Sequence, residues 1–302
     1  MLRKLCCLVI PFFLGTGIAS AQVTLELKYP EGTKHLVHTE GMSNQKMTLA
    51  GMAIDTKSTS FGIATTTIGK RDADGLLKLE EKVESLQVEL SLPGGLSLRF
   101  DSTNPGKKAD IPQLEPVLDS CRSQCLPVTV ELDAKNKIQS ANLPEGEYEK
   151  LPESVREAFT TEVLKKGLER SLACLPDEPV KKGDRWERST ELHLGEGQVM
   201  SFRTKFEYAG TLEQDGKTLD KITGKVFEVN YSAKANPAYQ ITKSDFKVID
   251  SDGTYLFDRE QGAVVLRSSK VQIGGTLTMV INGMELPGEV DLTMEEKVTR
   301  QK

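Results

Sequence analysis

The sequence has 302 residues, of which 38% are hydrophobic, 27% are charged and only 6% are aromatic, with a formal net charge of −5. The chain is long enough for one large domain or two ordinary ones. Because no surplus of basic residues is available to displace counterions, we expect no nucleic-acid partner; three histidines and no Cys/His cluster also predict no metal and no other cofactor.

The first 21 residues have the features of a secretory signal peptide. Arg3 and Lys4 form a charged start, an apolar stretch follows, and Ala19–Ala21 provides a small-residue cleavage site. The apolar stretch is too short for a bilayer of roughly 30 Å, and no later window reaches about 18 apolar residues. We therefore expect an exported protein, periplasmic or extracellular, without a transmembrane segment, whose mature part is residues 22–302.

Strict alternation of apolar and polar residues recurs along the chain and predicts strands with one buried and one solvated face. The clearest runs are Val23–Tyr29, Leu86–Leu92, Leu96–Phe100, Val128–Leu132, Met200–Tyr208, Leu277–Ile281 and Val290–Met294. Such alternation is typical of antiparallel sheets, because the strands of parallel sheets are buried on both faces. Near Val83–Ser85 the apolar frame slips by one residue, which predicts either a β-bulge or a loop.

Five residue pairs that accept positive φ predict tight turns between strands. They are Asp74-Gly75, Asp215-Gly216, Asp252-Gly253, Gly274-Gly275 and Asn282-Gly283. Together with the alternation, these turns indicate roughly a dozen strands.

Three cysteines, an odd number, remain after the signal peptide. They allow at most one internal disulfide and one spare thiol. Cys121 and Cys125 flank a three-residue segment and are the favoured pair. Pairing of Cys174 with that region and free thiols stay open as alternatives, since sequence does not determine connectivity.

Two segments interrupt the strand pattern. Residues Asp110–Cys125 hold apolar residues between prolines and predict a short helix, and Pro152–Leu175 predicts the one long helix. The apolar residues of the long helix form two rows, one of Val155, Phe159 and Val163 and the other of Leu164, Leu168 and Leu172. We expect both sides of this helix to be covered, the alternative being a bend at Gly167.

Geometry then predicts the architecture. A dozen strands about 4.8 Å apart would make a flat sheet about 60 Å wide, which one helix of about 36 Å length and 10 Å thickness cannot cover. We therefore predict an α+β, mainly β fold: a large curved antiparallel sheet, half-barrel-like, wrapping helix 152–175 within a single domain, 22–302. The alternative is two β halves, 22–141 and 183–302, joined by the helical segment.

Several short segments carry a resemblance to a known family. They are Leu25–Tyr29 with Glu31-Gly32, Leu98–Ser102, Leu175–Trp186, and Gly253–Asp258 with Gly262. The chain resembles a family of uncharacterised exported bacterial proteins, a domain of unknown function. A curved antiparallel sheet that encloses a helix is also loosely similar to the periplasmic lipoprotein-carrier fold, which implies binding of an apolar ligand. Neither resemblance implies catalytic residues.

Side chains with catalytic potential lack suitable partners. His35 and His38 would share a metal on a helix, but on the strand that their context predicts they point to opposite faces. No Gly-x-Ser-x-Gly elbow occurs. Trp186 begins a predicted strand, where a core role is more typical than a role as a ligand platform. We therefore expect no enzymatic activity.

The excess of one-sided strands over helix favours a binding or carrier module for an apolar or lipidic ligand in the cell envelope. We predict an apolar pocket between the sheet and the long helix, lined by Phe159, Leu168, Met200, Phe202, Phe206, Met279 and Met294. The alternative is a structural or protein-interaction role in the envelope, with an unknown protein partner.

Overall fold

The computed structural model describes residues 22–104, 112–195, 197–234 and 239–301, so the predicted signal peptide lies outside the described residues. Across these ranges, twelve strands form one antiparallel sheet: β1 (Lys34–Leu49), β2 (Met52–Arg71), β3 (Leu77–Ser91), β4 (Ser97–Asp101), β5 (Val128–Leu132), β6 (Ile138–Asn142), β7 (Arg185–Gly195), β8 (Gln198–Gln214), β9 (Lys217–Ala233), β10 (Gln240–Asp258), β11 (Ala263–Ile281) and β12 (Met284–Gln301). The mainly β character and the large antiparallel sheet are confirmed.

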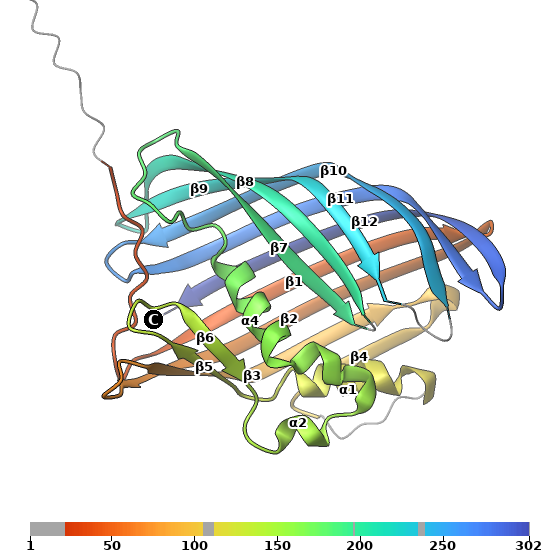
Figure 1. Cartoon of the computed structure of the whole chain (residues 1–302), viewed down its shortest axis with the longest axis horizontal. Coiled ribbons are helices and arrows are strands. Elements are labelled where there is room, and N and C mark those ends of the chain that lie inside the picture. The colour runs from red at the N-terminus through yellow and green to blue at the C-terminus, as the bar shows by residue number, and fades with distance from the viewer. Residues whose placement is uncertain (1–21, 105–111, 196, 235–238, 302) are drawn as a thin grey trace, which may run out of the picture.

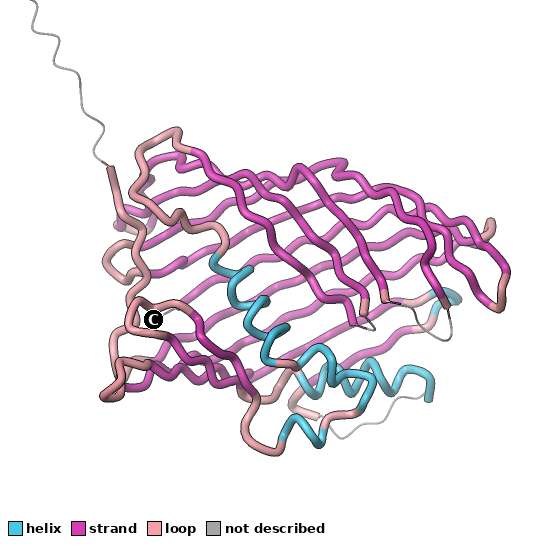
Figure 2. The backbone as a smooth tube through the Cα atoms, viewed as in Figure 1, coloured by secondary structure: helices cyan, strands magenta, loops and turns pink. Residues whose placement is uncertain are grey.

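The sheet is strongly curved and open (Figures 1 and 2). Its strand order is β6-β5-β3-β2-β1-β12-β11-β10-β9-β8-β7, with β4 paired to the outer part of β3. Pairing of β1 with β12 joins the strands before the helical region to those after it. The strands at the two ends of this order, β6 and β7, therefore face each other across the concave side of the sheet.

The prediction of one long helix over Pro152–Leu175 is wrong. The helices are short, α1 (Glu115–Ser123), α2 (Glu147–Lys150), α3 (Glu153–Arg156) and α4 (Thr161–Leu172), and short 3-10 turns lie at Pro93–Gly95, Pro112–Leu114 and Glu157–Phe159. The chain breaks at Thr160, which is extended at φ −66° and ψ 149°. The Val163 amide donates to Thr160 Oγ1 at 3.3 Å, so this hydroxyl caps a new helix.

The break divides the apolar residues of the expected helix: Val155 and Phe159 precede it, whereas Val163 and the row of Leu164, Leu168 and Leu172 lie in α4. Phe159 packs with Val155 and Leu151 in a cluster of the helical region. Leu168 packs against the cluster formed by β2, β3, β5 and β6, and Leu164 contacts both clusters. Neither covering of both sides nor a bend at Gly167 is needed.

Helix α4 lies between the two free edges of the sheet (Figure 1). Thr161 Oγ1 donates to Asn142 Oδ1 on β6 at 2.5 Å, and Lys166 Nζ forms an ion pair of 2.8 Å with Glu191 on β7. Free edges expose unpaired backbone groups that invite association with other chains. Here the edges are bridged by one short helix, which completes the wall around the hollow.

Hairpin turns agree with the predictions at three of the five pairs. Asp215-Gly216 and Asn282-Gly283 adopt positive φ at both residues, as two-residue hairpins need, and Asp74-Gly75 lies in the turn from β2 to β3. The bulge near Val83 is also confirmed, because the β2–β3 register slips between Ile63 and Ala64.

The turns predicted at Asp252-Gly253 and Gly274-Gly275 are wrong, because both pairs lie inside long strands, β10 and β11. At Gly275 a Cβ would stand only 2.1 Å from the Asp245 carbonyl oxygen. Glycine is needed there for close backbone approach rather than for a turn.

One end of the hollow is covered by the N-terminal segment (Figure 1). The predicted strand Val23–Tyr29 is instead an extended segment with a single bridge, between Val23 and Val180. Leu25 is buried against Phe257 and Cys174, and Tyr29 packs against the neighbouring cluster. Apolar alternation here serves to cover the end of the sheet, not to extend it.

Candidate functional site

A cavity of about 380 Å³ lies between the concave side of the sheet and α4. One wall is apolar and is contributed by β7, β8, β9, β11 and β12: Leu192, Phe202, Phe206, Val226, Val271 and Met294. Strand pleating explains this set, since alternate residues of each strand point to the same face. The size falls within the range of small-molecule sites.

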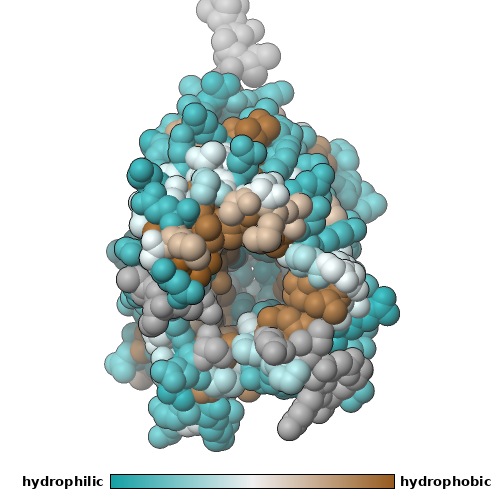
Figure 3. Space-filling view, turned by 90° about the vertical axis from the view of Figure 1, so that its right-hand side faces the viewer, coloured by the Kyte–Doolittle hydropathy of each residue, from teal (hydrophilic) through white to brown (hydrophobic). Residues whose placement is uncertain are grey.

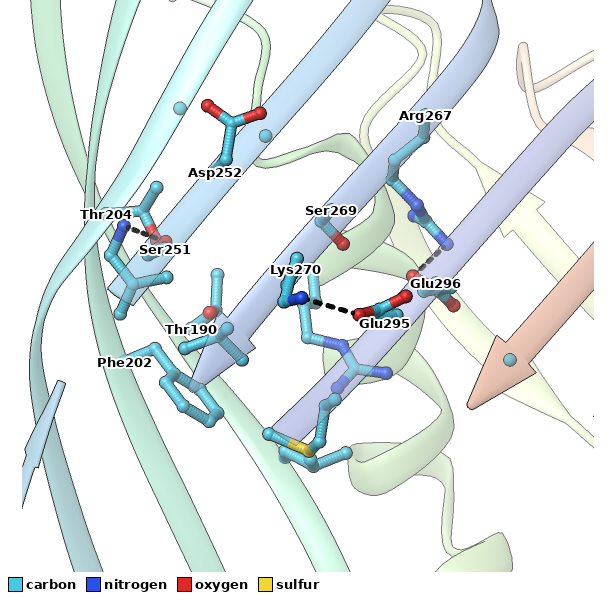
Figure 4. A pocket seen from close by; sticks show the side chains of 18 of the residues that line it. Thr190, Phe202, Thr204, Ser251, Asp252, Arg267, Ser269, Lys270, Glu295 and Glu296 are labelled. Atoms are coloured by element: carbon cyan, nitrogen blue, oxygen red, sulfur yellow. Dashed lines mark hydrogen bonds and ion pairs between the residues drawn. The ribbon is translucent and has the colours of Figure 1, made fainter. Parts of the chain in front are cut away.

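The end of the cavity nearest α4 is charged. Arg267 on β11 forms an ion pair with Glu296 on β12, with 3.1 Å between Nη2 and Oε2, as Figure 4 shows. Arg267 Nη1 also donates weakly to the Ser171 carbonyl at 3.4 Å. Its Nε is buried and has no hydrogen-bond partner. This guanidinium therefore keeps an unused donor.

Arg170, on the last turn of α4, adds a second cation. It lines the cavity and also the groove on the outer side of α4. Among the described residues, its guanidinium has no hydrogen bond or ion pair. Its pKa is lowered by burial, which Glu296 opposes and Arg267 reinforces. Two arginines and one carboxylate thus lie at this end of the cavity, and the carboxylate is paired with Arg267 alone.

The other charged residues around the cavity belong to the opposite face of the sheet. Lys270 and Glu295 are direct partners across β11 and β12 and form an ion pair of 2.9 Å. Both alternate with inward-pointing neighbours, Val271 and Met294. Asp252 is the β10 partner of Lys270 and points away from Arg267 in Figure 4. The concave face therefore carries a net positive charge near α4.

A second hollow, of about 280 Å³, lies on the other side of α4 and shares Arg267 with the first. Arg300 contacts His35 Nδ1 at 3.2 Å in it. Burial, with Arg300 adding to it, lowers the pKa of His35 to about 4. Burial also raises the pKa of Glu81. Polar groups therefore recur on the concave face beneath α4.

The end of the sheet opposite the N-terminal segment is open. Strands β9 and β10 pair only over Gly253–Phe257, and beyond that stretch they diverge. Tyr231 and Phe246 meet across the divergence with ring centroids 5.6 Å apart. Figure 3 shows a hollow at this end of the molecule, with apolar residues around it. We call this end the mouth.

The predicted pocket residues divide among several places. Phe202, Phe206 and Met294 line the cavity, and Leu168 lines the second hollow. The remaining three lie elsewhere: Met200 packs in the apolar cluster at the mouth, Phe159 packs within the helical region, and Met279 lies near the C-terminal end of β11. The structure thus brings together only the residues from the central part of the sheet.

The described cysteines, Cys121, Cys125 and Cys174, are all free thiols. Cys121 and Cys125 lie one helical turn apart, and the Cys125 thiol donates to the Cys121 carbonyl at 3.6 Å. The predicted disulfide is not formed in this structure. Cys174 is buried beside the cavity, and burial raises its pKa to about 12.

Sequence reasoning missed the charged residues of the cavity. Glu296 and Arg300 occupy the same alternate frame of β12 as Leu292, Met294 and Val298. A charge in an apolar frame is the signal that would have identified them. Arg170 gave no such signal, because its approach to the sheet depends on where α4 lies.

Two of the weaker predictions agree with the geometry. His35 faces the hollow, whereas His38 packs against Phe61 on the convex side, with ring centroids 6.4 Å apart. Trp186 stacks on Phe206, with ring centroids 6.0 Å apart, within the core of the covered end.

No group of three or more metal-ligating side chains occurs in the described part of the chain. None of its helices has the length and apolar character needed to cross a membrane.

Comparison with known proteins gives a family and little else. Residues 74–264 match the model of a family of unknown function, DUF6263. No curated protein matches the chain.

Solved structures align at low similarity. An outer membrane channel from Pseudomonas putida F1 is 9% identical, with a TM-score of 0.22 and coverage of 92% of this chain and 98% of that one. The outer membrane protein OprG from Pseudomonas aeruginosa is 7% identical, with a TM-score of 0.19 and coverage of 92% and 99%. A DUF1329 family protein from Desulfovibrio piger is 7% identical, with a TM-score of 0.13 and coverage of 86% and 84%. At these scores the likenesses carry no functional argument.

Proposed function

Since this chain belongs to the DUF6263 family, whose function is unknown, we propose its function from the site alone: an exported, non-enzymatic carrier that binds an apolar or lipidic ligand between the curved sheet and α4. The observation that carries the proposal is the cavity of about 380 Å³ with an apolar wall. The ligand would enter from the mouth.

Packing around the cavity supports the proposal. In the covered end, Phe257 and Ile222 are fully buried. At the cavity, Leu192, Val226 and Val271 are only partly buried, although their strands have the same alternation. Transferring apolar surface out of water is favourable by about 25 cal/mol per Å². A ligand with a hydrocarbon portion would gain this free energy on the uncovered wall.

The alternative role in protein interaction has weaker support. The large apolar residues most exposed on the surface, Met52, Ile249 and Met284, are between 61% and 64% exposed. Met52 and Met284 each follow the turn of a different hairpin, and Ile249 lies within β10. Apolar residues scattered singly are normal on soluble proteins and indicate no partner.

The absence of catalysis is part of the same proposal. It is supported by the lack of a nucleophile motif in the sequence and by the ion pairing of Arg267 with Glu296, which engages the cavity's carboxylate. Turnover of any small ester or phosphoester by the purified protein would oppose it.

The first test is native mass spectrometry of the protein purified from its own envelope, with lipid extraction of whatever co-purifies. The second uses N-phenyl-1-naphthylamine, a neutral apolar dye that fluoresces when shielded from water. Val271→Trp would fill the cavity, and we expect it to weaken dye binding by at least about tenfold.

The matched control is Gln272→Trp. Residue 272 follows Val271 on β11, and its side chain points to the opposite face of the sheet. Circular dichroism melting would verify that both variants fold. Equal dye binding by the wild type and both variants, or no binding at all, would contradict the carrier proposal.

A further inference from the structure

The cavity has two chemically different ends. Its wall toward the mouth is apolar, whereas Arg170, Arg267 and Glu296 gather at α4. A purely apolar ligand would leave the charged end in contact with nothing but water. A ligand with a hydrocarbon tail and a charged head would match both ends.

The sign of the charge selects the head group. Inside the cavity, two guanidinium groups meet one carboxylate, because Lys270, Glu295 and Asp252 belong to the convex face. Glu296 is already paired with Arg267. The remaining positive charge is that of Arg170, which is unpaired among the described residues.

The unused donors are suited to an oxyanion. Arg267 Nε is buried without a hydrogen-bond partner, and an unpaired buried donor destabilises the folded protein. Guanidinium groups present several N–H donors in a plane, which matches the oxygens of a carboxylate or phosphate. An anion between the two arginines would satisfy these donors and balance the charge.

We infer that Arg170 and Arg267 bind the carboxylate or phosphate head group of an anionic amphiphile, whose alkyl tail lies along the apolar wall toward the mouth. This inference rests on the proposed carrier function and names the class of its ligand. The lowered pKa of Arg170 is consistent with it, since a neighbouring anion would stabilise the charged form that burial disfavours.

The test compares three ligands with the same tail: decanoate, decanol and decyltrimethylammonium, each below its micelle concentration at pH 8. Displacement of N-phenyl-1-naphthylamine measures their affinities. We expect decanoate to bind about tenfold more tightly than decanol, and decyltrimethylammonium to bind most weakly, because charge-assisted hydrogen bonds favour only the anion.

The informative variant is Arg170→Gln, which removes the charge without leaving a paired carboxylate exposed. We expect it to weaken decanoate binding by about tenfold and to leave decanol unchanged. Arg170→Lys should restore part of the preference, since it keeps the charge but not the planar donors. Lys165→Gln, five residues earlier on α4, removes a charge outside the cavity and should change neither affinity.

The outcomes separate the two proposals. If none of the decyl compounds displaces the dye, the carrier function itself fails. If all three bind equally to wild type and Arg170→Gln, only the head-group inference is overturned. If calorimetry shows that inorganic phosphate binds in an Arg170-dependent way and decanoate does not bind, the site takes a free anion. The inference of an anionic amphiphile is then overturned.

Discussion

The two ends of the sheet are built from the same pattern but finish differently. At the covered end, Leu25 and Cys174 lie over Phe257 and Ile222, which are fully buried. At the mouth, Ile273 and Phe202 are buried as well, but no comparable segment of the described chain crosses them, and a cavity bordered by the partly buried Leu192, Val226 and Val271 remains. Alternation supplies an apolar face along the whole sheet, and this face is packed most completely where the N-terminal segment crosses it. The uncovered part is where we place function.

The largest test of this contrast is a matched pair of truncations. We expect Phe257→Ala to lower the free energy of unfolding by about 4 kcal/mol, because it opens a cavity in a packed core. Phe202→Ala should cost only about 2 kcal/mol, since Phe202 already borders a hollow and its removal creates less new empty space.

Urea unfolding monitored by circular dichroism would measure both values. A pair of variants with equal losses would mean that the mouth is packed as tightly as the covered end. In that case the contrast, and the carrier proposal with it, would lose its physical basis.

A second substitution acts on the cover itself. Leu25→Ala removes a buried side chain from the N-terminal segment, and we expect a loss of about 2–3 kcal/mol. Hydrogen exchange of β9 near Ile222 should accelerate, because that residue would lose its cover. Leu194→Ala is the control, since Leu194 is 45% exposed and its truncation should cost under about 0.5 kcal/mol. Unchanged exchange at Ile222 would show that the segment does not protect the sheet.

The strands could be predicted from the sequence far better than the N-terminal segment that covers one end of the sheet. Each strand reports its buried face through alternation, a local property, and the bulge near Val83 was predictable for the same reason. Whether Val23–Tyr29 pairs as a strand or crosses the sheet depends on segments far away in the chain. The break at Thr160 was missed because its hydroxyl caps a helix within a pattern that otherwise reads as continuous.

The candidate site was predictable only in its apolar half. Phe202, Phe206 and Met294 follow from alternation, since any residue on the concave face is a candidate. The meeting of Arg170 with Arg267 requires the position of α4 against the sheet. That position is set by contacts with β6 and β7, which no local pattern contains.

A third prediction concerns pH and the second hollow. The pKa of His35 is about 4 in the folded protein, below the value of about 6.5 expected when unfolded. Between these values the unfolded chain binds a proton that the folded protein does not, so stability falls as the pH falls through this window. With a discount for partial exposure, we expect His35 to account for about 1–2 kcal/mol of the loss between pH 7 and pH 5.

Comparison with His35→Gln isolates this contribution, because both proteins retain Arg300 and Glu81, which titrate or carry charge nearby. Urea unfolding at pH 7 and pH 5 gives the four free energies needed. If the wild type and His35→Gln lose equal stability on acidification, the imidazole is not buried as the structure has it.

The smallest expected effect tests how firmly α4 closes the wall between the two free edges. Thr160→Ala removes the N-cap of α4 and should cost about 1 kcal/mol, the usual value for such a loss. Leu164 and Leu168 are only partly buried, so the packing of the helix compensates little for this loss. We therefore expect its amides to exchange several-fold faster while those of β1 and β12, at the centre of the sheet, are unaffected. Glu169→Gln on the same helix leaves the cap intact and should change exchange little. Faster exchange throughout the sheet would instead mean that α4 and the sheet unfold as one cooperative unit. In that case α4 does not open on its own, and a ligand could reach the cavity only through the mouth.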